Sequence, residues 1–308
     1  MTVLPNSRLL YVIGNGFDLY HQIPSGYADF GRYVSKVDSS LHRLFENYFS
    51  FDGNWADFEN TLAHLDVDLI LNEASTYYVP YSADDWSDAF HHDYQYEIDR
   101  IVSSLSVELK RRFTEWVCRL TIPDPSSCAV PLLDLPLHAR YLSFNYTNTL
   151  QKLYGFSSDR ITHIHNYAAG LDSDLVLGHG VNPKTIGSLN AGADLEAQDA
   201  RVTQANECID DYFSRTYKPT DRVISAHQKF FDSLSDVKRI CVLGHSFAEV
   251  DWPYFALMAE KTKASNPHWI VSYHDETNIP LMKRALFEFG LPAVKVTYAC
   301  ITDIHPET

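Results

Sequence analysis

The first loop of the chain combines residue types that can hold a phosphate group. Gly14-Asn15-Gly16-Phe17-Asp18 follows the apolar run from Leu9 to Ile13. Two glycines permit positive φ and close backbone approach, so such a loop can direct N–H groups at a phosphate near the start of a helix. Asp18 would repel a phosphate, so we expect its carboxyl to accept from a ribose hydroxyl, orient a neighbour or cap the helix. The alternative is that the same two glycines form a tight turn that binds no ligand.

Polar residues also follow the later apolar runs. The amide of Asn145 can hold a water or a sugar hydroxyl, and the imidazole of His165, whose pKa is ordinarily about 6.5, can accept a proton at neutral pH. The carboxyl ends of parallel strands form the edge at which open α/β sheets bind ligands, so we expect these side chains to meet there. Further candidates for binding a nucleotide at this edge are Gly178, His179, Gly244, His245, Ser246 and Asp251.

Several of these residues also have a structural interpretation. Asn145 could cap the helix that follows it, and Asp251 could cap the helix that begins at Trp252-Pro253. A histidine flanked by isoleucines, such as His163, is more often a buried core residue than a ligand-binding one.

Short apolar runs without polar alternation predict strands buried on both faces of a parallel sheet. Here they alternate with helical patterns, which predicts an α/β fold with a Rossmann-like, mostly parallel sheet. The predicted strands cover residues 8–13, 140–144, 161–165, 174–177, 239–243, 268–273 and 294–298.

A long stretch interrupts this alternation. Residues 41–71 and 90–120 show the apolar spacing of helices, whereas residues 121–136 contain four prolines and must be irregular. We therefore predict a helical insertion or lid at residues 38–136, within a nucleotide-binding domain formed by residues 1–37 and 137–308.

Composition limits the partners and the compartment. The chain has 25 Lys+Arg against 40 Asp+Glu, a formal charge of −15, which opposes extended contact with nucleic acid or an anionic membrane. No run approaches the roughly 18 apolar residues of a membrane span, and the N-terminus lacks a signal-peptide pattern, so we expect a cytoplasmic protein. The five cysteines are never spaced C-x-x-C and no H-E-x-x-H occurs, so we expect no metal.

Six blocks of sequence, taken together, are similar to those of the AbiH family of bacterial abortive-infection proteins. The resemblance implies an antiphage effector that is restrained in uninfected cells, responds to a phage-derived trigger or partner protein, and could form a homo-oligomer through the helical insertion. The blocks span nearly the whole chain and are residues 14–20, 23–30, 55–59, 143–147, 163–165 and 243–255.

The AbiH family in turn resembles the sirtuin-like NAD-binding group through shorter motifs. The loop at residues 14–17, with Ile23-Pro24 after it, resembles the sirtuin glycine loop and its downstream segment. This resemblance implies that Asn145 positions water and the nicotinamide ribose, that His165 is the general base, and that Gly244-His245-Ser246 holds the adenosine side of NAD.

Two positions depart from the sirtuin-like pattern. Thr147 stands where that group commonly has an acid, which weakens the analogy in ribose binding. Asn166 stands where a glycine usually follows the histidine, which leaves open whether His163 or His165 faces the ligand.

The two resemblances together imply a hydrolase that cleaves NAD⁺, as its substrate, to ADP-ribose and nicotinamide. Cleavage passes through an oxocarbenium-like state that needs an oriented water and a base, roles that fall to Asn145 and His165, with Asp18 or Glu59 orienting the histidine or the ribose. Two alternatives stay open. One is a non-catalytic sensor of NAD or ADP-ribose. The other is a nuclease whose acids Asp18, Glu59 and Asp251 would have to share metal ions about 3.5–4 Å apart.

Overall fold

The computed structural model describes residues 8–50, 55–84, 86–88 and 91–305. The chain forms two compact units, each assembled from separate segments. The sheet unit consists of Met1–Gly26, Val117–Val176 and Pro219–Thr308, and the helical unit consists of Tyr27–Trp116 and Leu177–Lys218.

These bounds differ from those expected for the helical insertion and the domain around it. Residues 27–37 and 177–218 join the helical unit, and residues 117–136 join the sheet unit. Phe30 shows one reason, because its ring packs 5.7 Å from that of Trp55 and 5.2 Å from that of Phe113, both in the helical unit.

The sheet unit is built on six parallel strands in the order β3-β2-β1-β4-β5-β6. This is the strand order of a Rossmann fold, in which the order reverses between the first and fourth strands. The predicted α/β fold with a mostly parallel, Rossmann-like sheet is therefore confirmed. The strands are β1 (Leu9–Ile13), β2 (Arg140–Ser143), β3 (Ile161–His163), β4 (Arg239–Leu243), β5 (His268–Tyr273) and β6 (Val296–Cys300).

One predicted strand is wrong and another is too long. The N–H of Val176 donates to the carbonyl of His165 at 3.0 Å, but residues 174–177 form no strand, because this single bond is not extended into a ladder. β3 ends at His163 rather than at residue 165, and the chain turns at Asn166, whose φ is +61°. His165 therefore lies in the connection that follows β3.

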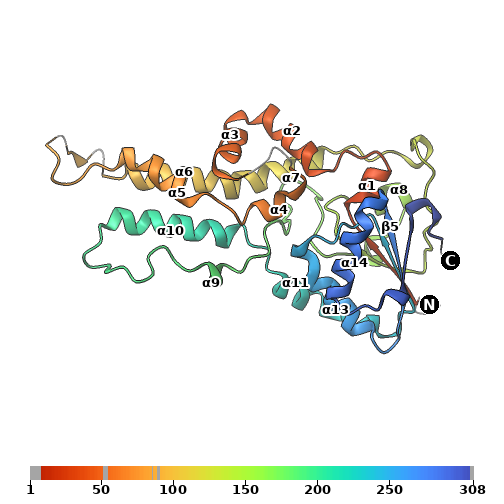
Figure 1. Ribbon diagram of the computed structural model, residues 1–308. Helices are drawn as coiled ribbons and strands as arrows, with labels where there is room; N and C mark the ends of the chain where they lie inside the picture. The colour runs from red at the N-terminus through yellow and green to blue at the C-terminus, as the bar shows by residue number, and fades with distance from the viewer. Residues whose placement is uncertain (1–7, 51–54, 85, 89–90, 306–308) are drawn as a thin grey trace. The chain divides into compact units, whose positions relative to one another are not determined.

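Apolar side chains cover both faces of the sheet, because successive residues of a strand point to opposite faces. Leu10 and Val12 pack with residues of α11, α12, α13 and α14, whereas Tyr11 and Ile13 pack with residues of α1 and α8. Figure 1 shows α13 and α14 beside the strands. The helices of this unit are α1 (Asn15–Tyr20), α8 (Thr149–Tyr154), α11 (Thr220–Ala226), α12 (Gln228–Asp232), α13 (Trp252–Thr262) and α14 (Ile279–Glu288).

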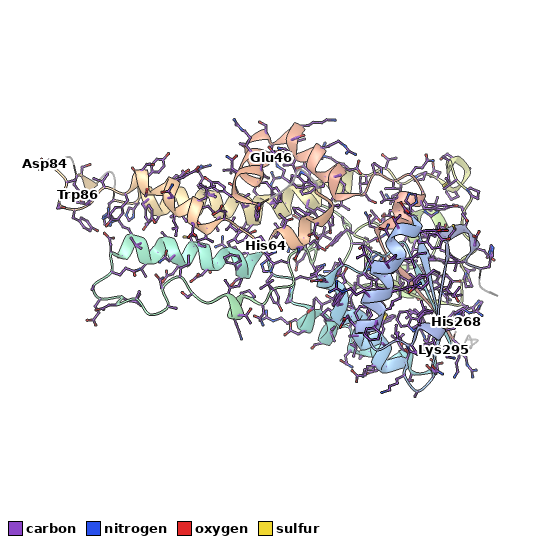
Figure 2. All side chains as sticks on the ribbon, viewed as in Figure 1. Glu46, His64, Asp84, Trp86, His268 and Lys295 are labelled. Carbon is purple, nitrogen blue, oxygen red and sulfur yellow. The ribbon has the colours of Figure 1, made fainter. Side chains whose placement is uncertain are left out.

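In the helical unit, α6 (Asp93–Ser103) and α10 (Ala200–Arg215) run side by side (Figure 1). A π-helical segment, Ser104–Glu108, connects α6 to α7 (Leu109–Arg119). Figure 2 labels Asp84 and Trp86 in the connection that leads from α5 to α6. The remaining helices are α2 (Tyr27–Val37), α3 (Ser39–Tyr48), α4 (Phe58–Thr61), α5 (Val67–Ala74) and α9 (Pro183–Ile186).

Candidate functional site

The first residues of α1, which begins directly after β1, pack backbone against backbone with the turn that follows β4. The N–H of Gly16 donates to the carbonyl of Gly244 at 2.7 Å, and that of Gly14 donates to the carbonyl of Leu243 at 2.9 Å. Gly244 has a φ of +69°, and a Cβ on it would lie 2.2 Å from the backbone nitrogen of Phe17. The contact between the two turns thus requires glycine and engages two of the N–H groups of the predicted phosphate loop.

Other residues of these turns differ in exposure. Asn15 is exposed, and its side-chain oxygen accepts a hydrogen bond of 2.6 Å from the hydroxyl of Ser25. Ser246 is exposed as well, whereas the ring of Phe17 is buried in the core. Binding of a nucleotide by these turns stays a prediction.

Asp18 lies in a buried polar cluster at the carboxyl ends of β1 and β2. Its side chain is 0% exposed, and its Oδ2 accepts a hydrogen bond of 2.5 Å from the hydroxyl of Thr147, which lies 3.0 Å from that of Thr149. Burial raises the pKa of Asp18 to about 6, and the polar side chains of Thr147, Thr149 and Asn145 beside it limit the rise. A carboxyl with this pKa can exchange a proton near neutral pH.

Asp18 and Asn145 retain unused hydrogen-bonding capacity. Asp18 Oδ1 and both side-chain polar atoms of Asn145 are buried and make no hydrogen bond of ordinary geometry within the described residues, although Asn145 is close enough to lower the pKa of Asp18. Buried polar atoms without partners destabilise a fold and call for an explanation. A bound ligand would supply the missing partners.

These atoms line a narrow recess of about 160 Å³ that has no room for the centre of a water molecule. A ligand could therefore reach them only if the recess widened. The side chains that line it belong to Ile13, Phe17, Asp18, Ser143, Asn145, Thr147, Thr149, Leu150 and His163.

The histidine of this recess is His163. The side-chain amide of Gln151 donates to its Nε2 at 2.9 Å, which leaves the proton on Nδ1, 3.4 Å from the carbonyl oxygen of Asn145. Burial lowers the pKa of His163 to about 4, so the ring is neutral at pH 7.

His165 lies in a second cluster, with Asp251 and His245. Its Nε2 is 3.5 Å from Asp251 Oδ1, and Nε2 of His245 is 3.4 Å from Asp251 Oδ2. The ring of Phe144 packs 5.4 Å from His165 and 4.5 Å from His245. Phe144 precedes Asn145 in the chain, so the two clusters are joined by consecutive residues at the same edge of the sheet. The structure thus pairs Asn145 with Asp18, and His165 with Asp251.

Gly178 and His179 belong to the helical unit. The N–H of His179 donates to the carbonyl of Thr216 at 2.8 Å, and the N–H of Lys218 donates to the carbonyl of His179 at 2.9 Å. A Cβ on Gly178 would lie 1.9 Å from the carbonyl oxygen of Thr216. Burial lowers the pKa of His179 to about 4. These contacts join the two ends of the segment Leu177–Lys218, and the expected part of Gly178 and His179 in nucleotide binding stays a prediction.

The acids of the nuclease alternative are in three separate settings. Glu59 pairs with the buried Lys218 in the helical unit, at 2.9 Å between Oε1 and Nζ, whereas Asp18 and Asp251 belong to the two clusters of the sheet unit. Within the described ranges, no group of three or more His, Cys, Asp or Glu side chains could hold a metal ion. The arrangement gives the nuclease hypothesis no support.

Sequence reasoning did not single out Thr149 or Gln151, and it treated Thr147 only as a departure from a pattern. A signal was present, because Asn145, Thr147 and Thr149 are polar and two residues apart. The helix after β2 begins only at Thr149, so Asn145 does not cap it.

A family model described as "Bacteriophage abortive infection AbiH" matches residues 10–273. Searches of curated proteins and of solved structures found no match. The comparisons give no support to the resemblance to sirtuin-like proteins. In the part of the chain that the structure covers, no helix is both long and apolar enough to span a bilayer.

Proposed function

Because the chain belongs to the AbiH family of bacteriophage abortive-infection proteins, we propose that it acts against phage by hydrolysing NAD⁺ to ADP-ribose and nicotinamide. The observation that carries this proposal is the group of unsatisfied buried atoms on Asp18 and Asn145, at the carboxyl edge of a Rossmann-type sheet. Open α/β sheets bind nucleotides at this edge.

The reaction requires a water, a proton acceptor and a hold on the ribose. The water oxygen bonds to the ribose carbon as the bond from that carbon to the nicotinamide nitrogen breaks, and the electron pair of this bond leaves with neutral nicotinamide. Asn145 can hold the water or a ribose hydroxyl, Asp18 can accept from a hydroxyl, and His165 can take the proton that the water loses. Phe144 packs with the core on one face of the sheet and Asn145 lies with Ile13 on the other, so a ligand must lie across the strand ends to meet both clusters.

The test is release of nicotinamide from NAD⁺ by the purified full chain, followed by chromatography. We expect Asn145→Ala and His165→Ala to lower kcat at least about 100-fold, the usual effect of losing acid–base catalysis. Release that persists at the wild-type rate in both variants would place the reaction elsewhere.

His268→Ala is the matched control. His268 is the first residue of β5, at the opposite edge of the same sheet, where its ring accepts from or donates to the hydroxyl of Thr297 at 2.9 Å. Figure 2 shows it next to Lys295, and burial together with Arg239 and Lys295 lowers its pKa. This variant should keep the wild-type kcat.

A nucleotide sensor is the second candidate, favoured by the position of His165, the proposed base, which is not among the residues that line the recess. A sensor would show a rise in Tm with NAD⁺ or ADP-ribose but no release of nicotinamide. Ligand at 100 times its Kd stabilises a protein by about 2.7 kcal/mol, so the shift would be easy to measure.

A further inference from the structure

Asp251 occupies the N-cap position of α13, but its carboxylate makes no capping hydrogen bond. An aspartate at this position ordinarily accepts from an N–H of the first helical turn. The two carboxylate oxygens of Asp251 instead lie 3.5 and 3.4 Å from the imidazoles of His165 and His245. The side chain of Asp251 is only 10% exposed, so its carboxylate is largely removed from water. The carboxylate points toward the two imidazoles and not toward the N–H groups of α13.

The backbone determines the proton position on His245. The N–H of Phe247 donates to Nδ1 of His245 at 2.9 Å, so in the neutral ring the proton is on Nε2, which faces Asp251. Phe247 has a φ of +59°, a strained conformation for this residue type, and its carbonyl accepts from the indole of Trp252 at 2.8 Å. The turn after β4 thus presents a donor to Asp251 Oδ2.

Aromatic rings restrict the orientation of His165. Tyr254 of α13 lies 5.5 Å away edge to face, Tyr146 is stacked at 6.0 Å, and Phe144 lies 5.4 Å away edge to face. With three rings around it, the imidazole keeps Nε2 toward Asp251 Oδ1.

We propose that Asp251, itself held by His245, is the residue that positions His165 for proton transfer. The carboxylate accepts from Nε2–H of His165, so in the neutral ring the proton stays on Nε2 and the lone pair is on Nδ1. This proposal rests on the proposed hydrolysis of NAD⁺, and it moves His245 and Asp251 from the expected binding of the cofactor to support of the base. The distance of 3.5 Å is long for a hydrogen bond, and we expect it to shorten when substrate binds.

The first test is the tautomer of His165, which does not require activity. The full chain is labelled with ¹⁵N-histidine, and the ring signals of His165 are assigned by their absence in His165→Gln. We expect Nε2–H in the wild type and a mixture of tautomers in Asp251→Asn. An unchanged tautomer in Asp251→Asn would overturn the proposal.

The second test is kinetic. Asp251→Asn should lower kcat for nicotinamide release at least 100-fold and change KM less than threefold, whereas Asp251→Glu should recover part of the lost kcat. His245→Gln keeps an N–H donor toward Asp251, so it should retain the Nε2–H tautomer of His165 and lose less than tenfold in kcat. A wild-type kcat in Asp251→Asn would overturn the positioning role.

The two proposals can fail separately. A wild-type protein that releases no nicotinamide removes the proposed hydrolysis, while the tautomer of His165 still reports whether Asp251 positions it. If Asp251→Asn did not fold, Asp251→Glu and His245→Gln would still test the assignment, and loss of the Nε2–H tautomer in His245→Gln would contradict it.

Discussion

At the scale of single residues, the site is defined by a carboxyl group kept away from water. Asp18 is fully buried, and its pKa is raised to about 6 by that burial. At pH 7 the group is mostly ionised without the solvation an exposed carboxylate would have. The fold tolerates this because the hydroxyl of Thr147 donates to one oxygen, and the other oxygen stays available to a ligand.

The contribution of Asp18 to the free energy of unfolding should therefore fall as the pH rises toward the pKa of its buried carboxyl group. The folded protein holds this proton up to about pH 6, whereas an unfolded aspartate loses it near pH 3.9, so the contribution of Asp18 to stability falls between these values. The full difference corresponds to about 3 kcal/mol at 1.4 kcal/mol per pKa unit. Asp18→Asn should remove this dependence, so we expect the variant to gain stability over the wild type as the pH rises from 4 to 7.

Urea denaturation at several pH values measures this difference. The comparison must be between wild type and Asp18→Asn, because buried His163 and His179, whose pKa values are lowered to about 4, affect stability with the opposite sign over the same range. A stability difference between the two proteins that does not vary with pH would contradict the raised pKa of Asp18.

At the scale of elements, the contact between the turns after β1 and β4 explains the glycines of the first loop. The glycines at residues 14–16 are compatible with a phosphate loop in the sequence, and in the structure their backbone lies against Gly244. The same contact holds the turn that carries His245. The packing at the junction of β1 and β4 and the position of the cluster around Asp251 therefore depend on one backbone contact.

Gly244→Ala should be much more destabilising than Gly155→Ala. Both glycines have a φ near +70°, but a Cβ at Gly155 would meet nothing within 4 Å, whereas one at Gly244 would meet the backbone of Phe17 at 2.2 Å. We expect about 1–2 kcal/mol for Gly155→Ala from the left-handed backbone alone. Overpacking should add about 1–3 kcal/mol for Gly244→Ala. Equal losses in thermal or urea unfolding would show that the turns can separate without strain.

At the scale of the whole molecule, contacts between distant segments define the helical unit. Glu59 and Lys218 are 159 positions apart, yet they form a buried ion pair in which the lysine side chain is 0% exposed. The neighbouring backbone of Lys218 is bonded to His179. These contacts close a unit whose two segments are separated in the chain by β2 and β3.

Removing one partner of this pair should destabilise the protein more than replacing both. Glu59→Gln leaves a buried ammonium group without its carboxylate, and we expect a loss of about 3–5 kcal/mol. The double variant Glu59→Leu/Lys218→Met removes both charges and should be about as stable as the wild type. A double-mutant cycle in urea measures the coupling between the two residues, and additive losses would show that the pair acts as two independent groups.

Much of the fold could be predicted from local patterns. Six of the seven predicted strands correspond to β1–β6, because a strand buried on both faces must be a short apolar run. The strand predicted at residues 174–177 is wrong because a short apolar run can also be buried outside a sheet. Leu175 and Leu177 are buried in a connection that is not part of the sheet.

Apolar runs and the order of motifs are properties of the chain alone, and they were enough to predict the α/β fold class and membership of the AbiH family. Three features are visible only in the folded chain: His163 lines the recess of Asp18, His165 faces Asp251, and residues 177–218 join the helical unit. Each of these depends on distances between segments far apart in the chain, which residue types and local spacing do not specify.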